Sequence, residues 1–365
     1  MNTSDFQITS KQLGFMIIGT MLGVNFLALP RIASASSQQD AWIAVITGSF
    51  LPLLVLLLIE RLGRRFPGQD FIEMSQALFG KVMGSLLAAI LGIHMLCVAA
   101  TVIIRFAYLD TVYLLPETPR SVICLLILLG ALYVAGKGAR VVARVNELMF
   151  YLYLPVLLLF ALPLLKAAEY TYLMPVGGSG LGNIARSSWD ACLYFGRMEF
   201  LMVAYFMVIR KDEVVKAGVS AVTFVALLYM MLTIACLLVV GPENLQNQVL
   251  PLIGELKANG FQFVDRTDLL FVAVWSVAFR PVFNMLCMCG FSFTRLLNLP
   301  EKRHYFLVLF IIGTAAYLLT FVPRSAVEIV IYTDWYGYTY PVMGLGYPLL
   351  YHLAAAVRGR KVPNV

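Results

Sequence analysis

One stretch near the start of the chain combines helix-breaking residues with a depth at which a membrane protein could hold a small ligand. Residues 19–24 read GTMLGV and lie in the middle of the first apolar run, 12–30. At a helical rise of about 1.5 Å per residue, Gly19 and Gly23 lie about 12–18 Å from Lys11. That is close to the midplane of a hydrocarbon core about 30 Å thick. Two glycines so close together weaken an uninterrupted helix.

Two interpretations of residues 19–24 follow from this depth. Irregular backbone inside a membrane is tolerated only where protein covers it or where it lines a cavity. The stretch is therefore either a broken helix whose free N–H groups could receive a carboxylate, or a Gly-x-x-x-Gly groove for a neighbouring helix. The stretch alone leaves both open.

A second stretch repeats the feature in the other half of the chain. Residues 194–199 read YFGRME, so a glycine and two charges interrupt the apolar run 184–209. An unbroken helix would point Arg197 and Glu199 in nearly opposite directions. A break at Gly196 removes that conflict and places Glu199 in the first turn of a new helix, where the dipole favours an anion. Paired interruptions are expected of inverted repeats with a ligand site between them, and the pairing favours the broken-helix interpretation.

The composition indicates that membrane-spanning helices position residues 19–24 and 194–199. The chain has 365 residues, of which 61% are hydrophobic and 13% charged, whereas soluble domains carry about 25% charged residues. We therefore predict an all-α polytopic membrane protein, 1–365, with inverted repeats over about 8–166 and 180–358. Ten apolar runs are long enough to span: 12–30, 41–59, 82–113, 119–136, 145–165, 184–209, 214–240, 266–294, 304–322 and 339–357.

The basic residues predict the orientation of these spans. If the N-terminus is cytoplasmic, 17 of the 27 lysines and arginines fall on the inner side and seven on the outer side. The remaining three, Arg105, Arg197 and Arg280, fall inside spans. The positive-inside rule therefore places both termini in the cytoplasm. It also explains the net charge of +7 without a nucleic-acid partner.

The remaining polar and aromatic residues point to no enzyme. All six cysteines lie in apolar runs and the three histidines are scattered, so neither a disulfide framework nor a metal site is predicted. We expect no catalytic residues and no cofactor. Residues 67–80 predict an amphipathic helix along the inner interface. The tyrosines and tryptophan of 332–340 are typical of an interfacial aromatic belt.

Two further residues could serve a site inside the membrane. Thr101 lies near the middle of the run 82–113, where its hydroxyl could meet a ligand or bond its own helix. Arg280 lies about 21 Å from either flank of its span. A guanidinium at that depth is usually functional or paired inside the bundle, although backbone carbonyls could also satisfy it.

The sequence resembles the spore-germination permeases, the B subunits of bacterial germinant receptors within the amino acid/polyamine/organocation transporter superfamily. The resemblance rests on ITSKQ at 8–12, GTMLGV at 19–24 and LPR at 29–31, and on DRTDLLF at 265–271 followed by Trp275. It implies a leucine-transporter-like 5+5 inverted repeat with broken spans 1 and 6. It also implies a ligand held between these and spans 3 and 8. Asn25 departs from the small residue expected there and leaves the ligand's identity open.

The resemblance also implies partners and a place of action. The ligand would be an amino acid or similar small germinant, and the partners a receptor A subunit and a lipoprotein C subunit in the inner membrane of the spore. The predicted ligand site comprises Gly19, Thr20, Leu22, Gly23, Val24, Thr101, Tyr194, Phe195 and Gly196. Related sodium-coupled transporters bind sodium between spans 1 and 8, where Arg280 would stand in for the coupling cation.

Three functions are consistent with these features. The first is a germinant-receptor subunit that binds its ligand at the membrane midplane and triggers germination. The second is an active amino acid transporter, either proton-coupled or an exchanger, with the same site. The third is a scaffold subunit that has lost ligand binding and anchors its partners.

Overall fold

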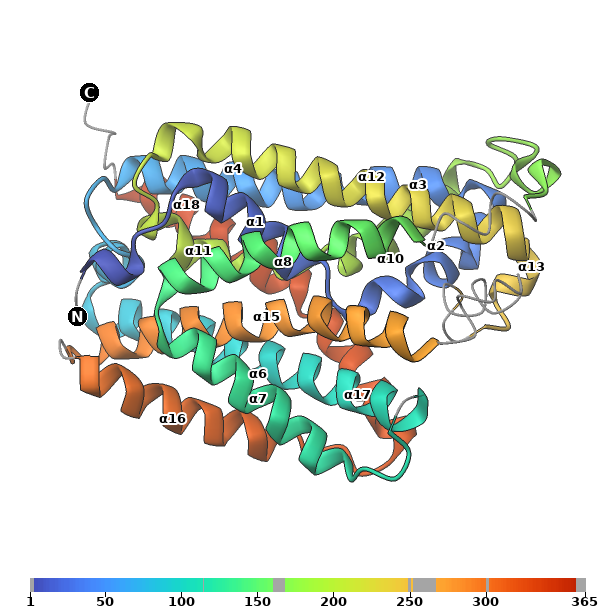
Figure 1. The fold of residues 1–365 in the computed structure, drawn as a ribbon. Helices are drawn as coiled ribbons and strands as arrows, with labels where there is room; N and C mark the ends of the chain where they lie inside the picture. The colour runs from blue at the N-terminus through green and yellow to red at the C-terminus, as the bar shows by residue number, and fades with distance from the viewer. Residues whose placement is uncertain are drawn as a thin grey trace.

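The computed structural model describes residues 3–113, 115–159, 168–248, 251, 267–299 and 302–358. Within these residues the regular secondary structure is helical, apart from one isolated parallel bridge between Ile8 and Val208. The helices run roughly lengthwise and form one elongated bundle (Figure 1). The predicted all-α membrane fold is confirmed.

The first half of the chain follows the predicted apolar runs closely. After the broken first span come α3 (Ala41–Gly48) and α4 (Phe50–Arg65), the short α5 (Phe71–Phe79), and the long α6 (Lys81–Tyr113). Next come α7 (Arg120–Gly136) and α8 (Ala139–Leu159). The end of the fifth predicted run, 160–165, lies outside the described residues.

The second half adds two described helices that lie outside the predicted apolar runs, α13 (Pro242–Leu245) and α17 (Ala326–Gly337). Its helices are the interrupted sixth span, α12 (Val214–Val240), α13, α15 (Thr267–Leu296), α16 (Lys302–Leu319), α17 and α18 (Tyr347–Val357). A π-helical turn, Pro341–Gly346, precedes α18. The Asp265–Arg266 part of the family motif lies outside the described residues.

The first span is broken where the glycines predicted it. A capping box between Thr9 and Gln12 starts α1 (Ser10–Met21), because each side chain accepts from the other residue's backbone N–H. The helix ends at Met21, and Gly23 has extended backbone. A 3-10 turn, Val24–Ala28, then leads into α2 (Leu29–Ser37).

The sixth span is broken at the predicted glycine as well. The helix α10 (Leu181–Tyr194) ends before Gly196, and Arg197 adopts the left-handed conformation with φ of 77°. A 3-10 turn, Met198–Phe200, and the short α11 (Leu201–Ala204) follow. Glu199 therefore lies in the first turn after the break, as predicted.

Contacts between distant segments place the start of the chain beside several predicted cytoplasmic loops. The N–H of Ile8 donates to the carbonyl of Met207 (3.0 Å), and the carbonyl of Ile8 accepts from the N–H of Ile209 (3.0 Å). Asp5 pairs with Lys302 at the start of α16 (3.3 Å). Both termini lie at this end of the bundle (Figure 1). This shared end agrees with the predicted alternation of loops, and the cytoplasmic orientation stays a prediction.

Helix length does not confirm ten separate spans. Four described helical segments are long and apolar enough to cross a membrane: Phe26–Arg65, Lys81–Val112, Lys211–Val240 and Lys302–Leu319. The pair α7 and α8, bent by 120°, would add one more. Spans 1 and 6 fall short because their breaks leave helices of 12 and 14 residues.

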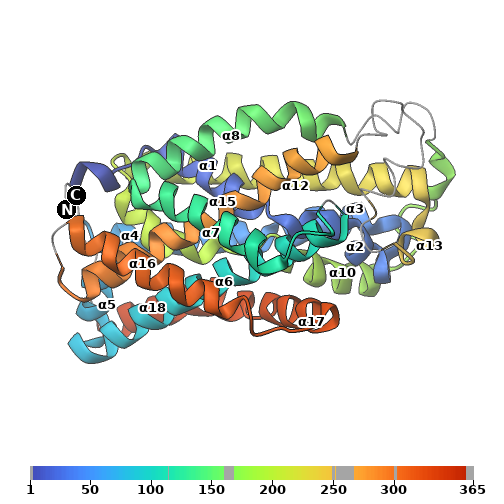
Figure 2. The same ribbon diagram turned by 60° about the horizontal axis from the view of Figure 1, so that its bottom comes forward.

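Two predictions about the segments between spans meet different outcomes. The predicted amphipathic helix forms as α5, capped by Asp70 and Glu73 and with one face buried. The aromatic segment before the last span is helix α17, which packs against α6 (Figure 2). Trp335 and Tyr338 are exposed, as an interfacial belt requires, whereas Tyr340 is buried. The belt interpretation does not account for the buried Tyr340, and for the exposed residues it stays a prediction.

Candidate functional site

A small cavity lies where the sixth-span break meets α6 and α17. Its volume is about 40 Å³, far below the roughly 300–1,000 Å³ of pockets for drug-sized molecules. Most of its lining side chains are polar or aromatic. They include His94, Thr101, Arg197, Glu199, Thr333, Tyr336, Thr339 and Tyr340, together with Gly196.

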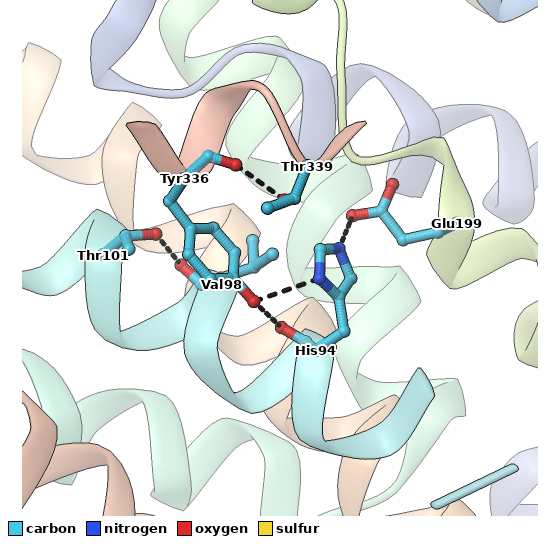
Figure 3. A network of polar contacts seen from close by, with 6 residues as sticks. All are labelled: His94, Val98, Thr101, Glu199, Tyr336 and Thr339. Atoms are coloured by element: carbon cyan, nitrogen blue, oxygen red, sulfur yellow. Dashed lines mark hydrogen bonds and ion pairs between the residues drawn. The ribbon is translucent and has the colours of Figure 1, made fainter. Parts of the chain in front are cut away.

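A histidine and a carboxyl group form the centre of this cavity (Figure 3). The Nε2 atom of His94 lies 3.1 Å from Oε1 of Glu199, and both side chains are buried. On the other side of the ring, Nδ1 of His94 lies 3.0 Å from the hydroxyl of Tyr336. The same hydroxyl lies 3.2 Å from the backbone carbonyl of His94, so its single proton goes either to this carbonyl or to Nδ1. When the hydroxyl donates to Nδ1, Nε2 carries the ring proton and donates to Glu199. The contacts tie α6, the sixth-span break and α17 together.

The two breaks meet through Arg197. Its left-handed backbone turns the side chain toward the first span, so that Nη1 lies 3.1 Å from where a β-carbon on Gly23 would stand. Gly23 therefore leaves the space that the guanidinium uses. This contact supports the interpretation that the two interruptions belong to one site.

Two of the predicted ligand-site residues line the cavity. Gly196 faces it, and a β-carbon there would lie 2.9 Å from the carbonyl oxygen of Leu193 and 3.1 Å from the ring of Tyr340. Thr101 also lines the cavity while its hydroxyl donates to the carbonyl of Val98 (2.8 Å). Donation to its own helix leaves its oxygen lone pairs available to a ligand.

Three predicted residues stand beside the cavity and do not line it. Phe195 is fully buried against Tyr229, with ring centroids 5.0 Å apart. The hydroxyl of Tyr229 in turn donates to the carbonyl of Met21 at the end of α1 (2.8 Å). Leu22 is buried at that break and Tyr194 is half-buried. The side chain of Val24 lies outside what the structure describes.

Gly19 and Thr20 belong to a packing contact between spans 1, 5 and 8. A β-carbon on Gly19 would overlap Oδ1 of Asn146. The hydroxyl of Thr20 donates to the carbonyl of Met16 (2.7 Å) and accepts from Nδ2 of Asn284 (2.8 Å). Gly19 therefore serves close packing, whereas Gly23 lies in a break. The N–H groups of Leu22 and Gly23 donate to the carbonyls of Ile18 and Met21 (both 2.9 Å), so they are not the free donors that the broken-helix interpretation expected.

Arg280 is fully buried beside this packing contact. Its Cδ lies 3.2 Å from the β-carbon position of Gly19, and its guanidinium lies over the ring of Tyr153, 5.4 Å from the centroid. None of its three nitrogens has a hydrogen-bond partner among the described residues. Its side chain therefore lies against span 1, and none of the described backbone carbonyls accepts a hydrogen bond from it. Its role as a stand-in for a coupling cation stays a prediction.

Ten of the twelve residues that line the cavity were left out of the predicted site, among them His94, Arg197, Glu199, Tyr336 and Tyr340. His94 was considered only as a metal ligand, and the tyrosines only as belt residues. The available signal was depth, because ionisable residues inside spans are usually functional. Arg105, another such residue, pairs with Asp334 of α17 (2.9 Å) beside the cavity.

Solved structures similar to this one are transporters. The chain matches a Na⁺-coupled sialic acid symporter with a TM-score of 0.68 at 14% identity, over 95% of this chain and 78% of that one. It matches MhsT, solved in complex with L-phenylalanine, with a TM-score of 0.60 at 11% identity, over 96% and 99% of the two chains. These likenesses confirm the predicted leucine-transporter-like fold.

Several similar sequences are spore germination proteins of Bacillus species. Spore germination protein YndE of Bacillus subtilis is 27% identical over 74% of this chain and 75% of its own length. Spore germination protein B2 of the same species is 21% identical over 94% of each chain. GerQB of Bacillus cereus is 24% identical over 76% of each. A family described as spore germination protein matches residues 7–329, and the chain therefore belongs to the spore germination permease family.

Proposed function

We propose that this protein is the permease-like subunit of a germinant receptor, binding a small amino-acid-like germinant at the membrane midplane and so triggering germination. Its family membership makes it a non-enzymatic integral membrane protein with a role in spore germination. The observation that carries the binding proposal is the contact of Arg197, which lines the cavity at the second break, with the position of Gly23 at the first break.

The ligand site that we propose keeps the predicted residues and extends them with the cavity. Backbone groups at the breaks, Gly23 and Gly196 among them, approach the ligand, while Thr101 offers its oxygen. Glu199 and Arg197 add one charge of each sign. A cavity of about 40 Å³ favours a small ligand and requires helices to separate as it enters.

Arg280 supplies a fixed positive charge between spans 1 and 8 in this proposal. It replaces a coupling cation, so ligand binding needs no sodium. Support comes from its complete burial and its contact with the Gly19 position. Arginine remains protonated at physiological pH, so this charge is permanent.

The proposed setting is the inner membrane of the spore, with both termini in the cytoplasm. The proposed partners are a receptor A subunit and a lipoprotein C subunit. Co-purification of these two subunits with a tagged copy of this chain from spore membranes tests the assembly. Recovery of the chain alone under conditions that keep membrane complexes intact would contradict it.

Thermal unfolding of the purified protein tests ligand binding. A ligand at a hundred times its dissociation constant stabilises the folded state by about 2.7 kcal/mol. We expect one or a few of the common amino acids to raise the unfolding temperature. Spores that lack the gene should then fail to germinate in response to that amino acid. If no amino acid stabilises the protein, a scaffold role replaces the receptor.

An active amino acid transporter is the second candidate, and its support is the similarity to symporter structures. Uptake of the stabilising amino acid into proteoliposomes separates the two. The receptor proposal expects binding without accumulation, both with and without a proton gradient. Accumulation that follows the gradient would identify a transporter.

A further inference from the structure

The cavity contains two buried oxygen atoms without a partner. Oε2 of Glu199 and the hydroxyl of Tyr340 have no hydrogen bond to any described residue. Glu199 is 1% exposed and Tyr340 is 4% exposed, and both line the cavity. A buried acceptor that stays unpaired is unfavourable, and more so when it is charged. Oε2 of Glu199 can therefore accept a hydrogen bond from a ligand in the cavity, and the hydroxyl of Tyr340 can donate or accept one.

The contacts of Glu199 show which of its two carboxyl oxygens is open to a ligand. His94 holds Oε1, so the carboxyl group cannot rotate freely, and Oε2 points away from the histidine (Figure 3). His94 is itself held by Tyr336. The aromatic rings of Tyr336 and Tyr340 also line the cavity. An anionic oxygen among aromatic rings is a setting that favours a cation.

The cavity also presents a positive charge. Arg197 lines it two residues before Glu199, and its guanidinium makes no hydrogen bond or ion pair within the described part of the chain. Arg105 is already paired with Asp334. Arg197 and Glu199 both follow Gly196 in the chain, so the cavity just after the break presents a guanidinium and one carboxyl oxygen, Oε2 of Glu199, that His94 does not contact.

We propose that Glu199 and Arg197 recognise a zwitterion. The ligand's ammonium group donates to Oε2 of Glu199, and Arg197 donates to the ligand's carboxylate. This inference rests on the proposed function. It adds that two side chains, and not only backbone groups at the breaks, recognise the two charges of the ligand. A ligand with a single charge would leave either Glu199 or Arg197 unpaired in a buried site.

Three related probes test this recognition in the purified full-length protein. The first is the amino acid that stabilises the wild type most, the second is the amine without its carboxylate, and the third is the acid without its amine. We expect the wild type to bind the amino acid at least tenfold more tightly than either analogue. If the amine binds as tightly as the amino acid, the protein does not recognise the carboxylate. If the acid binds as tightly, the protein does not recognise the ammonium group.

Two variants test which residue recognises the ammonium group of the ligand and which recognises its carboxylate. Removing one partner of a buried charge pair typically costs 2–5 kcal/mol, so Glu199→Gln should weaken amino acid binding by roughly 30-fold or more. The same variant should bind the acid analogue as the wild type does. Arg197→Gln should show the reverse, with weaker amino acid binding and unchanged binding of the amine. A general structural defect would not split the analogues in this way.

A matched control removes an acid outside the cavity. Asp190 lies in α10, upstream of the break, and Asp190→Asn should bind all three probes as the wild type does. If the wild type binds an amino acid and Glu199→Gln binds it equally well, the zwitterion proposal fails while the proposed function stands. If no amino acid stabilises the wild type, both fail together.

Discussion

Arg280 carries a charged guanidinium in surroundings that offer it no hydrogen-bond acceptor among the described residues. It is fully buried, and its guanidinium has aromatic contact with Tyr153 but no hydrogen bond among the described residues. Replacing buried ionic groups with apolar side chains of similar volume is often neutral or stabilising by about 1–4 kcal/mol. A residue that costs stability and is nevertheless present points to function.

Arg280→Met should therefore separate stability from function. We expect the variant to unfold at a temperature equal to or higher than that of the wild type, because an unpaired charge has left the interior. Its ligand response should be lost, and Arg280→Lys should retain part of it. Thermal unfolding in detergent and a ligand-response assay measure the two effects, with Arg186→Met on the exposed side of α10 as the control.

The same residue predicts the ion dependence. Ligand response of the wild type should be equal in sodium and potassium buffers, because the positive charge is built into α15. A clear sodium requirement, or a normal response from Arg280→Met, would leave Arg280 with a packing role only.

Two glycines give a second prediction at the scale of single residues. A β-carbon on Gly23 would lie 3.1 Å from Nη1 of Arg197, and one on Gly196 would lie 2.9 Å from the carbonyl of Leu193. Extra volume in a packed interior costs typically 1–3 kcal/mol. We expect Gly23→Val and Gly196→Val to lose ligand response while still inserting into the membrane.

Gly182→Val is the control for both glycine variants. Gly182 lies near the start of α10, where no atom of the described residues, apart from its chain neighbours and the backbone of its own helix, stands within 4 Å of its β-carbon position. Its response should equal that of the wild type. Membrane fractionation and ligand-induced thermal shift provide the readouts. Normal ligand binding by Gly23→Val would mean that the site lies elsewhere.

At the scale of elements, α17 covers the cavity and is held to α6. Arg105 bonds Thr333 (2.8 Å) and Asp334 (2.9 Å), and Tyr336 bonds His94. The carboxylate of Asp334 is half exposed, so its pairing is weak and reversible. Weak contacts of this kind suit a helix that must separate from its neighbour when a ligand enters.

Asp334→Asn should loosen α17. Exposed ion pairs contribute about 0.2–1 kcal/mol, so we expect a cysteine at Thr339 to react about two to five times faster with a water-soluble maleimide. The background should carry Cys97→Ser. Exchanging the charges, with Arg105→Asp and Asp334→Arg together, should restore the slow rate. An unchanged rate in Asp334→Asn would show that α17 is held by other contacts.

At the scale of the whole molecule, the testable property is orientation. Asp40 bonds the N–H groups of Gly177 (2.7 Å) and Ser179 (3.0 Å), so these loops share one end of the bundle. The other end joins Asp5 to Lys302 and Arg295 to Asp70. The contacts fix which loops lie together, and the positive-inside rule alone says which end is cytoplasmic.

Cysteine labelling from outside the cell measures the orientation. A cysteine at Ser179 or Asn244 should react with an impermeant maleimide, and one at Lys137 should not. Gly138, although in the same loop as Lys137, is unsuitable because its φ is +90° and a β-carbon would lie 2.8 Å from the carbonyl oxygen of Asp5. If Lys137→Cys is labelled while the cysteines at Ser179 and Asn244 are not, the orientation is the opposite of the predicted one.

Features that depend on neighbouring residues could be read from the order of amino acids. The apolar runs predicted the helices, and the glycines at 23 and 196 predicted the two breaks. Both follow from local physics, since span length and helix weakness depend on residues close in the chain. The family resemblance added the transporter fold, which the structural comparisons confirm.

Contacts between distant residues could not be read in the same way. His94 and Glu199 are 105 positions apart, and Tyr336 is 242 positions from His94. The sequence predicted that Thr20 and Gly19 contact a ligand. In the structure the Thr20 hydroxyl accepts a hydrogen bond from Asn284, and Gly19 packs against Asn146. Which polar groups pair and which remain open depends on how the helices rotate and cross. That arrangement is set by the packing of the whole bundle, because a buried polar group takes whatever partner the neighbouring helix brings to it.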